Sequence, residues 1–182
     1  DFVSVPQAGL INADYLKERA KLISMQKTIG TPTAGTPPGV VAAKGKDNSL
    51  ALPSTTHLSI IDNAGNAVSM TTTIENGFGS LQMVRGFLLN NQLTDFSFTA
   101  QDAAGNPIAN SVQAAKRPRS SMAPTLIFNA STGDLEGAIG SPGGSAIIQY
   151  TTKSILGMTD WGLNVQQAIN LPNFGAQTNA TT

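Results

Sequence analysis

The sequence predicts an α+β fold, and three features support this. Two pairs of β-branched or alternating segments are each separated by turn residues, which is the pattern of β-hairpins. Near both ends of the chain, apolar residues recur at helical spacing, which predicts helices there. With 182 residues and 40% hydrophobic content, the chain can bury a core of the size of one domain.

The first predicted element is a helix over residues 12–26. Asn12 is its expected N-cap, and Leu16 and Ile23 lie on one face at helical spacing. The following residues, 30–54, are rich in proline and glycine, which favours an extended, exposed linker.

Two hairpins and two helices are predicted in the remainder of the chain. The strands of the hairpins are expected over residues 56–62 and 67–74, and over 124–128 and 135–139. The helices are expected over residues 145–156 and 164–169.

Composition and charge disfavour several classes of function. Eleven basic and eleven acidic residues cancel, so no basic surface for nucleic acid or an anionic membrane is expected. No apolar run approaches the roughly 20 residues needed to span a bilayer. Cysteine is absent, which excludes disulfides, thiolate metal sites and a cysteine nucleophile. The chain begins with Asp1 rather than methionine, so we expect an excised or processed piece.

The single histidine, His57, does not fit a serine hydrolase. A G-x-S-x-G motif is absent, and GSPGG at 140–144 breaks its spacing. His57 is interpreted as a strand residue on the same face as Thr55 and Ser59, packed or hydrogen-bonded. One histidine without cysteine cannot form an ordinary zinc cluster, and no phosphate-binding glycine motif occurs.

Two adjacent threonines, Thr55 and Thr56, lie where the irregular segment becomes a strand. One interpretation is ordinary β-propensity. The other is that cleavage before Thr55 makes it an N-terminal nucleophile whose own α-amine acts as base. The pKa of an α-amine is about 7.7 to 8, so the base is available near neutral pH. The residues alone leave both interpretations open.

A series of motifs resembles the γ-glutamyltranspeptidase family in order and at compatible spacing. The motifs are TTHLSIID (55–62), GNAV (65–68), FGS (78–80), LLNNQ (88–92), DFS (95–97), KRP (116–118), SSM (120–122), GSPGGS (140–145) and GLNV (162–165). The resemblance implies that residues 1–54 are the end of a large subunit and residues 55–182 most of a small subunit. It also implies the αββα sandwich of N-terminal nucleophile hydrolases.

The resemblance assigns catalytic roles. It implies self-cleavage between Ser54 and Thr55, and Thr55 as the nucleophile that accepts a γ-glutamyl group. Thr73 would orient the α-amine of the nucleophile. Gly143 and Gly144 would supply backbone N–H donors of an oxyanion hole.

Substrate-binding roles follow from the same resemblance. Glu75, Gln92 and Asp95 would receive the α-ammonium group, and Ser120 with Ser121 would face the α-carboxylate. The family's main carboxylate-binding arginine would lie upstream of this chain. Neither Arg117 nor Arg119 is assigned as its substitute.

The predicted function is transfer or hydrolysis of γ-glutamyl groups of glutathione-like amides, without a metal or organic cofactor. Two alternatives stay open: a cephalosporin or glutaryl acylase of the same family, and a non-catalytic assembly module. The resemblance implies a periplasmic or secreted protein and a partner in the missing part of the large subunit. The isolated chain is expected to be inactive and to self-associate through exposed apolar surface. The acceptor, whether water, amino acid or peptide, is left undetermined.

Overall fold

The chain divides into two compact units, which are described separately. The computed structural model describes residues 3–41, 44–47, 49 and 54–175. The first unit contains the described residues up to 47 and residues 97–116, and the second contains residues 49, 54–96 and 117–175. The predicted subunit boundary at Ser54–Thr55 concerns cleavage, which this division does not test, and it stays a prediction.

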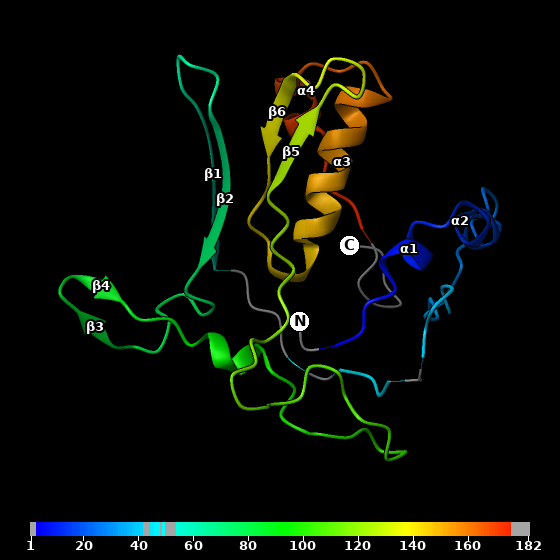
Figure 1. Ribbon diagram of the computed structural model, residues 1–182, viewed down its shortest axis with the longest axis vertical. Coiled ribbons are helices and arrows are strands. Elements are labelled where there is room, and N and C mark those ends of the chain that lie inside the picture. Colours follow the sequence, from blue (N-terminus) through cyan, green and yellow to red (C-terminus); the bar gives the residue numbers. More distant parts are fainter. Residues whose placement is uncertain (1–2, 42–43, 48, 50–53, 176–182) are drawn as a thin grey trace. The chain divides into compact units, whose positions relative to one another are not determined.

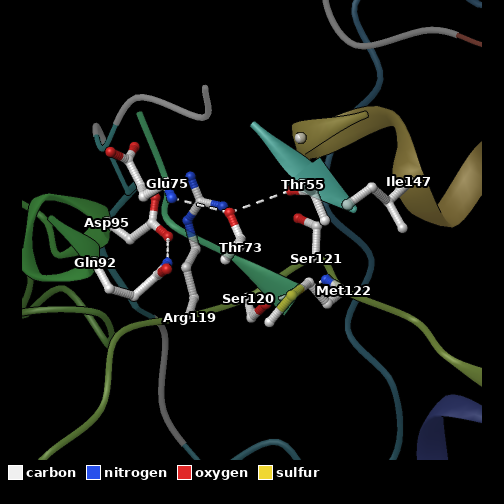
Figure 2. Close-up of a pocket in the computed structure, with 11 residues that line it drawn as sticks. Thr55, Thr73, Glu75, Gln92, Asp95, Arg119, Ser120, Ser121, Met122 and Ile147 are labelled. Atoms are coloured by element: carbon white, nitrogen blue, oxygen red, sulfur yellow. Dashed lines mark hydrogen bonds between the residues drawn. The ribbon is translucent and has the colours of Figure 1, made fainter. Parts of the chain in front are cut away.

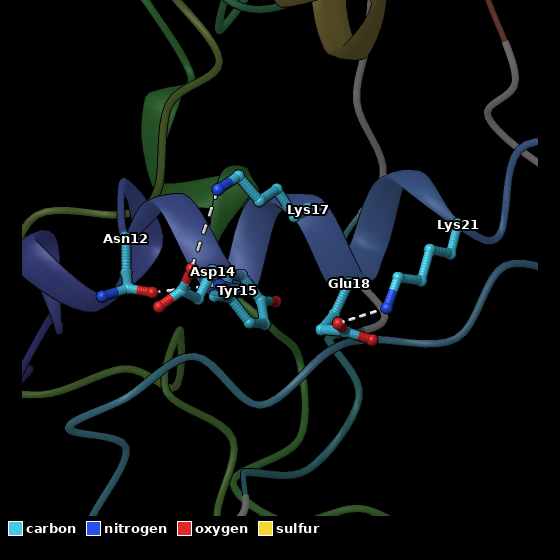
Figure 3. Close-up of polar contacts among 6 residues, drawn as sticks. All are labelled: Asn12, Asp14, Tyr15, Lys17, Glu18 and Lys21. Atoms are coloured by element: carbon cyan, nitrogen blue, oxygen red, sulfur yellow. Dashed lines mark hydrogen bonds and ion pairs between the residues drawn. The ribbon is translucent and has the colours of Figure 1, made fainter.

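The first unit begins with two short helices, α1 (Gln7–Leu10) and α2 (Ala13–Ala20). Asn12 is the N-cap of α2, as predicted, and its side chain accepts a hydrogen bond from the backbone N–H of Tyr15 at 2.9 Å (Figure 3). The prediction that the helix reaches residue 26 is wrong.

The apolar face that was expected to stabilise the last turns of this helix is not buried. Leu16 is 49% exposed and Ile23 is 75% exposed, so little burial supports continuation beyond Ala20. The ion pair between Lys21 and Glu18 in Figure 3 is also largely exposed, and pairs of this kind contribute about 0 to 1 kcal/mol.

The rest of the first unit is irregular. No helix or strand occurs among the described residues of 30–47, while residues 42–43, 48 and 50–53 lie outside the described structure. That this segment is a linker stays a prediction. Two long-range hydrogen bonds hold this segment to residues 97–116. Gly45 N–H donates to the Pro107 carbonyl, and the Asn110 amide donates to the Asp47 carboxylate, both at 3.0 Å.

The second unit begins with the antiparallel hairpin of β1 (Thr55–Ile61) and β2 (Ala67–Thr73). The Asp62 carboxylate forms its turn by accepting hydrogen bonds from the backbone N–H groups of Ala64 and Asn66 at 2.9 and 2.8 Å. The predicted hairpin is confirmed, and its register pairs the first residue of β1, Thr55, with the last of β2, Thr73.

The two faces of this hairpin differ in an unusual way. Thr55, His57, Thr71 and Thr73 are half-buried on one face, whereas Ile60, Val68 and Met70 of the opposite face are exposed. The cross-strand pair of Ile60 and Val68 is 57% and 49% exposed. An exposed apolar row on a strand is typical of a surface that another chain segment covers.

A second hairpin and two helices form the other part of this unit. They are β5 (Thr125–Phe128), β6 (Leu135–Ile139), α3 (Ile147–Thr159) and α4 (Val165–Asn170), close to the predicted bounds. Figure 1 shows the β5–β6 hairpin beside α3, and both elements line one cavity. The Ser69 hydroxyl connects the two hairpins: it donates to the Ile139 carbonyl at 3.0 Å and accepts from Thr125 N–H at 3.2 Å.

Helices α3 and α4 pack closely around two residues of α3. A Cβ on Gly157 would lie 2.9 Å from the Cβ of Ala168, which is fully buried, so glycine permits the helices to approach. Lys153 is only 4% exposed, and its ammonium donates to the carbonyl groups of Ala168, Ile169 and Leu171 at 3.0, 3.4 and 3.1 Å. The lysine thereby caps the C-terminal end of α4.

The described elements are mixed α and β, as predicted. Their strands form three two-stranded sheets, the third being β3 (Met83–Val84) with β4 (Phe87–Leu88), neither of which was predicted. The αββα layering therefore stays a prediction. Within the described ranges, no helix is long and apolar enough to cross a membrane.

Candidate active site

A small cavity in the second unit brings together eight of the nine catalytic and substrate-binding residues predicted from the sequence (Figure 2). They are Thr55, Thr73, Glu75, Gln92, Asp95, Ser120, Ser121 and Gly144; Arg119, Met122 and Ile147 complete the lining. The cavity volume is about 30 Å³, which accommodates one or two water molecules but no amino acid. The predicted residues therefore surround a cavity that is smaller than an amino acid.

The Thr73 hydroxyl is the centre of the hydrogen-bond network around the predicted cleavage site. Its O–H donates to the carbonyl oxygen of Ser54 at 3.0 Å. Its oxygen accepts from the Thr55 hydroxyl at 3.4 Å and from the Glu75 backbone N–H at 2.9 Å. A hydroxyl offers one donor and two acceptor sites, so these three bonds use its full capacity.

Glu75 provides a buried carboxylate next to this network. It is 4% exposed and accepts hydrogen bonds from the Asn91 amide and from the Thr94 hydroxyl, the latter at 3.1 Å. Its backbone has a φ of 71°, in the left-handed region that a non-glycine residue rarely adopts. The bond from its N–H to Thr73 supports this conformation, and strain of this kind is common at functional sites.

Gln92 and Asp95 are the first and last residues of a short 3₁₀-helix, η1 (Gln92–Asp95). The Gln92 side-chain amide donates to the Asp95 carboxylate. Figure 2 shows both side chains on the same side of the cavity as Glu75, so two carboxylates and an amide are close together there. Such a group suits a ligand ammonium.

Ser120 and Ser121 lie in the irregular segment that leads into β5. The Ser120 hydroxyl accepts a hydrogen bond from Met122 N–H at 3.2 Å, and both serines line the cavity near Thr55. Arg119, to which sequence reasoning assigned no role, also lines it. Its position next to the Ser-Ser motif was the available signal, but spacing alone does not separate it from Arg117.

Gly143 and Gly144 precede α3, and the second of them begins the 3₁₀ turn η2 (Gly144–Ala146). Their φ values of 137° and 56° lie in the region that favours glycine, and a Cβ on Gly143 would lie 2.8 Å from the Tyr150 ring. Gly144 lines the small cavity, whereas Gly143 lines an adjacent hollow together with Thr55. Both glycines are thus near the predicted nucleophile.

His57 does not line this cavity. Its Nδ1 is 2.9 Å from the Thr71 hydroxyl and its Nε2 is 3.1 Å from the Ser59 hydroxyl, which supports its interpretation as a hydrogen-bonded strand residue. Burial lowers the pKa of His57 below its usual 6.5, so the ring is neutral at neutral pH. No cluster of three or more histidine, aspartate or glutamate side chains suited to a metal occurs in the described part of the chain.

Comparisons with known proteins agree with the motifs of the site. The profile of the family described as gamma-glutamyltranspeptidase matches residues 1–182. The chain is 39% identical over 182 residues to the glutathione hydrolase proenzyme of Bacillus subtilis (strain 168), and 38% identical over 185 residues to that of Escherichia coli (strain K12). These alignments cover 96% and 97% of this chain but 30% of each relative, so the chain spans under a third of their length.

A solved structure of a γ-glutamyltranspeptidase is also similar to this chain. A crystal structure of a Helicobacter pylori gamma-glutamyltranspeptidase mutant matches with a TM-score of 0.60 and 39% identity, over 67% of this chain and 68% of that one. A family match over the whole chain, together with relatives of this identity, establishes membership. The chain belongs to the γ-glutamyltranspeptidase family.

Proposed function

We propose that the protein containing this chain is a γ-glutamyltransferase and glutathione hydrolase whose nucleophile, Thr55, is exposed by self-cleavage of the Ser54–Thr55 bond. The observation that carries the proposal is the position of the Thr73 hydroxyl, which contacts both the Ser54 carbonyl oxygen and the Thr55 hydroxyl. The relatives named glutathione hydrolase proenzyme support it, because a proenzyme requires a maturation step.

Maturation would begin with attack of Thr55 Oγ1 on the carbonyl carbon of Ser54. The Thr73 hydroxyl donates to the oxygen of that carbonyl, where negative charge develops as the tetrahedral intermediate forms. Collapse breaks the C–N bond, leaves Ser54 as an ester on Thr55 Oγ1, and frees the α-amine, which takes up the proton of the hydroxyl. Water then hydrolyses the ester and restores the threonine hydroxyl.

Turnover would reuse the same nucleophile. The Thr55 α-amine accepts the hydroxyl proton while Oγ1 attacks the γ-amide of the substrate. Backbone N–H groups of Gly143 and Gly144 would stabilise the oxyanion. The leaving amine takes the proton, and water or an acceptor amine then releases the γ-glutamyl group from its ester. Besides water or the acceptor amine, these steps use only groups of the protein.

The charges of the cavity favour a γ-glutamyl group over the glutaryl group of an acylase substrate. A glutaryl group has the same carboxylate but lacks the α-ammonium. Such a substrate would bring only a carboxylate to a lining that contains the carboxylates of Glu75 and Asp95, and it would offer no ammonium to them. Ser120 and Ser121 would donate to the carboxylate in either case.

The remainder of the protein would complete the site. The exposed Ile60 and Val68 of the first hairpin are proposed to pack against it, and it would also supply a further carboxylate-binding arginine. The isolated chain is expected to be inactive and to self-associate; turnover of a γ-glutamyl anilide by a monomer on a sizing column would contradict this. A periplasmic or secreted location is proposed from family membership, and fractionation of the source cells tests it.

The decisive experiment uses the full-length protein and its Thr55→Ala, Thr73→Val and Thr56→Ala variants. Intact mass should reveal two chains that meet at Ser54–Thr55 in the wild type. Thr55→Ala should abolish both cleavage and turnover of γ-glutamyl anilide. Thr73→Val keeps the side-chain volume but lacks the donor, so we expect cleavage to slow by about 10²- to 10³-fold.

Thr56→Ala is the matched control, because Thr56 is the neighbouring threonine and its side chain is exposed on the other face of β1. It should mature and turn over substrate like the wild type. A mature chain that begins at a residue other than Thr55, or full activity of Thr55→Ala, would refute the assignment.

A further inference from the structure

The cavity contains one arginine that the proposed mechanism does not use. Arg119 is half-buried and lines the cavity next to Ser120. Figure 2 shows its side chain extending toward the side where Thr73, Glu75 and Asp95 lie. A guanidinium is always charged, so the lining carries a fixed positive charge as well as two carboxylates.

In the uncleaved chain, one edge of this guanidinium is bonded to a neutral oxygen. Arg119 Nε and Nη2 donate to the Ser49 hydroxyl at 3.0 and 2.7 Å. Two donors of the planar group thus converge on one atom. A carboxylate would offer two charged oxygens to the same two donors, and bidentate, charge-assisted bonds of this type are about twice as strong as neutral ones.

Ser49 lies on the N-terminal side of the proposed cleavage bond. While Ser54 and Thr55 are joined, the serine is tethered only a few residues from the cavity. After cleavage it belongs to a different chain from Arg119, and its local concentration near the guanidinium falls. Maturation would therefore make this edge of Arg119 available to a ligand.

We propose that Arg119 binds the carboxylate of the γ-glutamyl donor and so determines specificity for substrates with an amino-acid head group. This inference rests on the proposed function. The Ser49 hydroxyl occupies the guanidinium until cleavage, and the substrate carboxylate replaces it in the mature enzyme. The ammonium of the same head group lies toward Glu75 and Asp95, so the cavity matches both charges of a zwitterion.

The test compares three amides as competitive inhibitors of γ-glutamyl anilide turnover by the mature full-length enzyme. L-Glutamine carries both charges of the head group, glutaramate carries only the carboxylate, and 4-aminobutanamide carries only the ammonium. Arg119→Gln should weaken inhibition by glutamine and glutaramate about 10- to 100-fold, since bonds to charged groups are lost. Inhibition by 4-aminobutanamide should not weaken, because it has no carboxylate to lose a bond, and KM for the anilide should rise more than kcat falls.

Arg117→Gln is the matched control, because it removes the same charge two residues away at an exposed position outside the cavity lining. It should leave all three inhibition constants unchanged. If Arg119→Gln does not mature, Arg119→Lys replaces it in the test. Lysine keeps the positive charge but lacks the planar pair of donors, so it should weaken inhibition by glutamine and glutaramate only, and by a smaller factor.

The outcomes separate this inference from the proposed function. Equal weakening of all three inhibitors, or no change in any of them, would overturn the role of Arg119 while the wild type still turned over γ-glutamyl anilide. A mature wild type that did not turn over the anilide would instead refute the proposed function.

Discussion

Replacement of Lys153 by methionine should destabilise the α3–α4 pair. The side chain is 4% exposed, and its ammonium bonds three carbonyl groups at the end of α4. Methionine keeps most of the volume but offers no donor. Three carbonyl groups that have no following helical turn would then lose their partner.

The expected loss can be worked out from the individual bonds. The bonds to Ala168 and Leu171, at 3.0 and 3.1 Å, have good geometry, whereas the bond to Ile169 is long at 3.4 Å. Assigning about 1 to 2 kcal/mol to each of the two good bonds gives a decrease of about 2 to 4 kcal/mol in the free energy of unfolding. For a chain of this size, that corresponds to a decrease in Tm of about 5 to 15 °C.

Thermal unfolding followed by circular dichroism measures the change in Tm, and hydrogen exchange localises it. Amides of α4, a helix of only six residues that depends on its tertiary contacts, should exchange faster than those of β1 and β2. Lys153→Gln, which retains two neutral donors, should lose less stability. Lys17→Met removes a lysine whose side chain is 75% exposed and should change Tm little. The reasoning fails if Lys153→Met and Lys17→Met have the same Tm.

Two further predictions concern His57. Gly140→Ala would place a Cβ 2.3 Å from His57 Cε1, so the ring must move and lose its bond to Thr71. We expect urea unfolding to show a decrease of about 1 to 3 kcal/mol in the free energy of unfolding. Gly137→Ala should be tolerated better, because its Cβ would lie 3.7 Å from its nearest neighbour. Because burial lowers the pKa of folded His57 below 6.5, the unfolded chain binds the proton first. The contribution of His57 to the free energy of unfolding should therefore be fully present above pH 6.5. It should decrease as the pH falls from 6.5 to the lowered pKa. Urea unfolding across this range should show a smaller decrease in His57→Gln, and an identical pH dependence of the two proteins would contradict the prediction.

Local sequence signals predicted those elements whose formation is decided by nearby residues. The turn between β1 and β2 is formed by Asp62 and the residues that follow it, and Asn164 forms a capping box with Gln167 at the start of α4. Both depend on side chains within a few positions of each other. The length of α2 depends instead on whether Leu16 and Ile23 find a surface to pack on, and their spacing does not contain this information.

Sequence motifs predicted most residues of the candidate site. They did not predict contacts between residues that only the folded chain brings together. Arg119 and Ser49 are 70 positions apart, and no periodicity connects them. The left-handed backbone of Glu75 could not be expected either, because glutamate gives no signal for that conformation. The first feature depends on a contact between distant residues, and the second on a bond from Glu75 N–H to the Thr73 side chain that becomes visible only in the folded chain.

The hairpin register explains why two threonines meet at the proposed cleavage site. Once the turn after Asp62 pairs Ile61 with Ala67, each step back along β1 is matched by one step forward along β2, so Thr55 must face Thr73. A slip of one residue would turn the Thr73 hydroxyl to the opposite face and remove it from the Ser54 carbonyl. The chemistry proposed for residue 55 is therefore fixed by a turn seven residues away, and a residue inserted into β2 should abolish cleavage even if Thr55 and Thr73 are both retained.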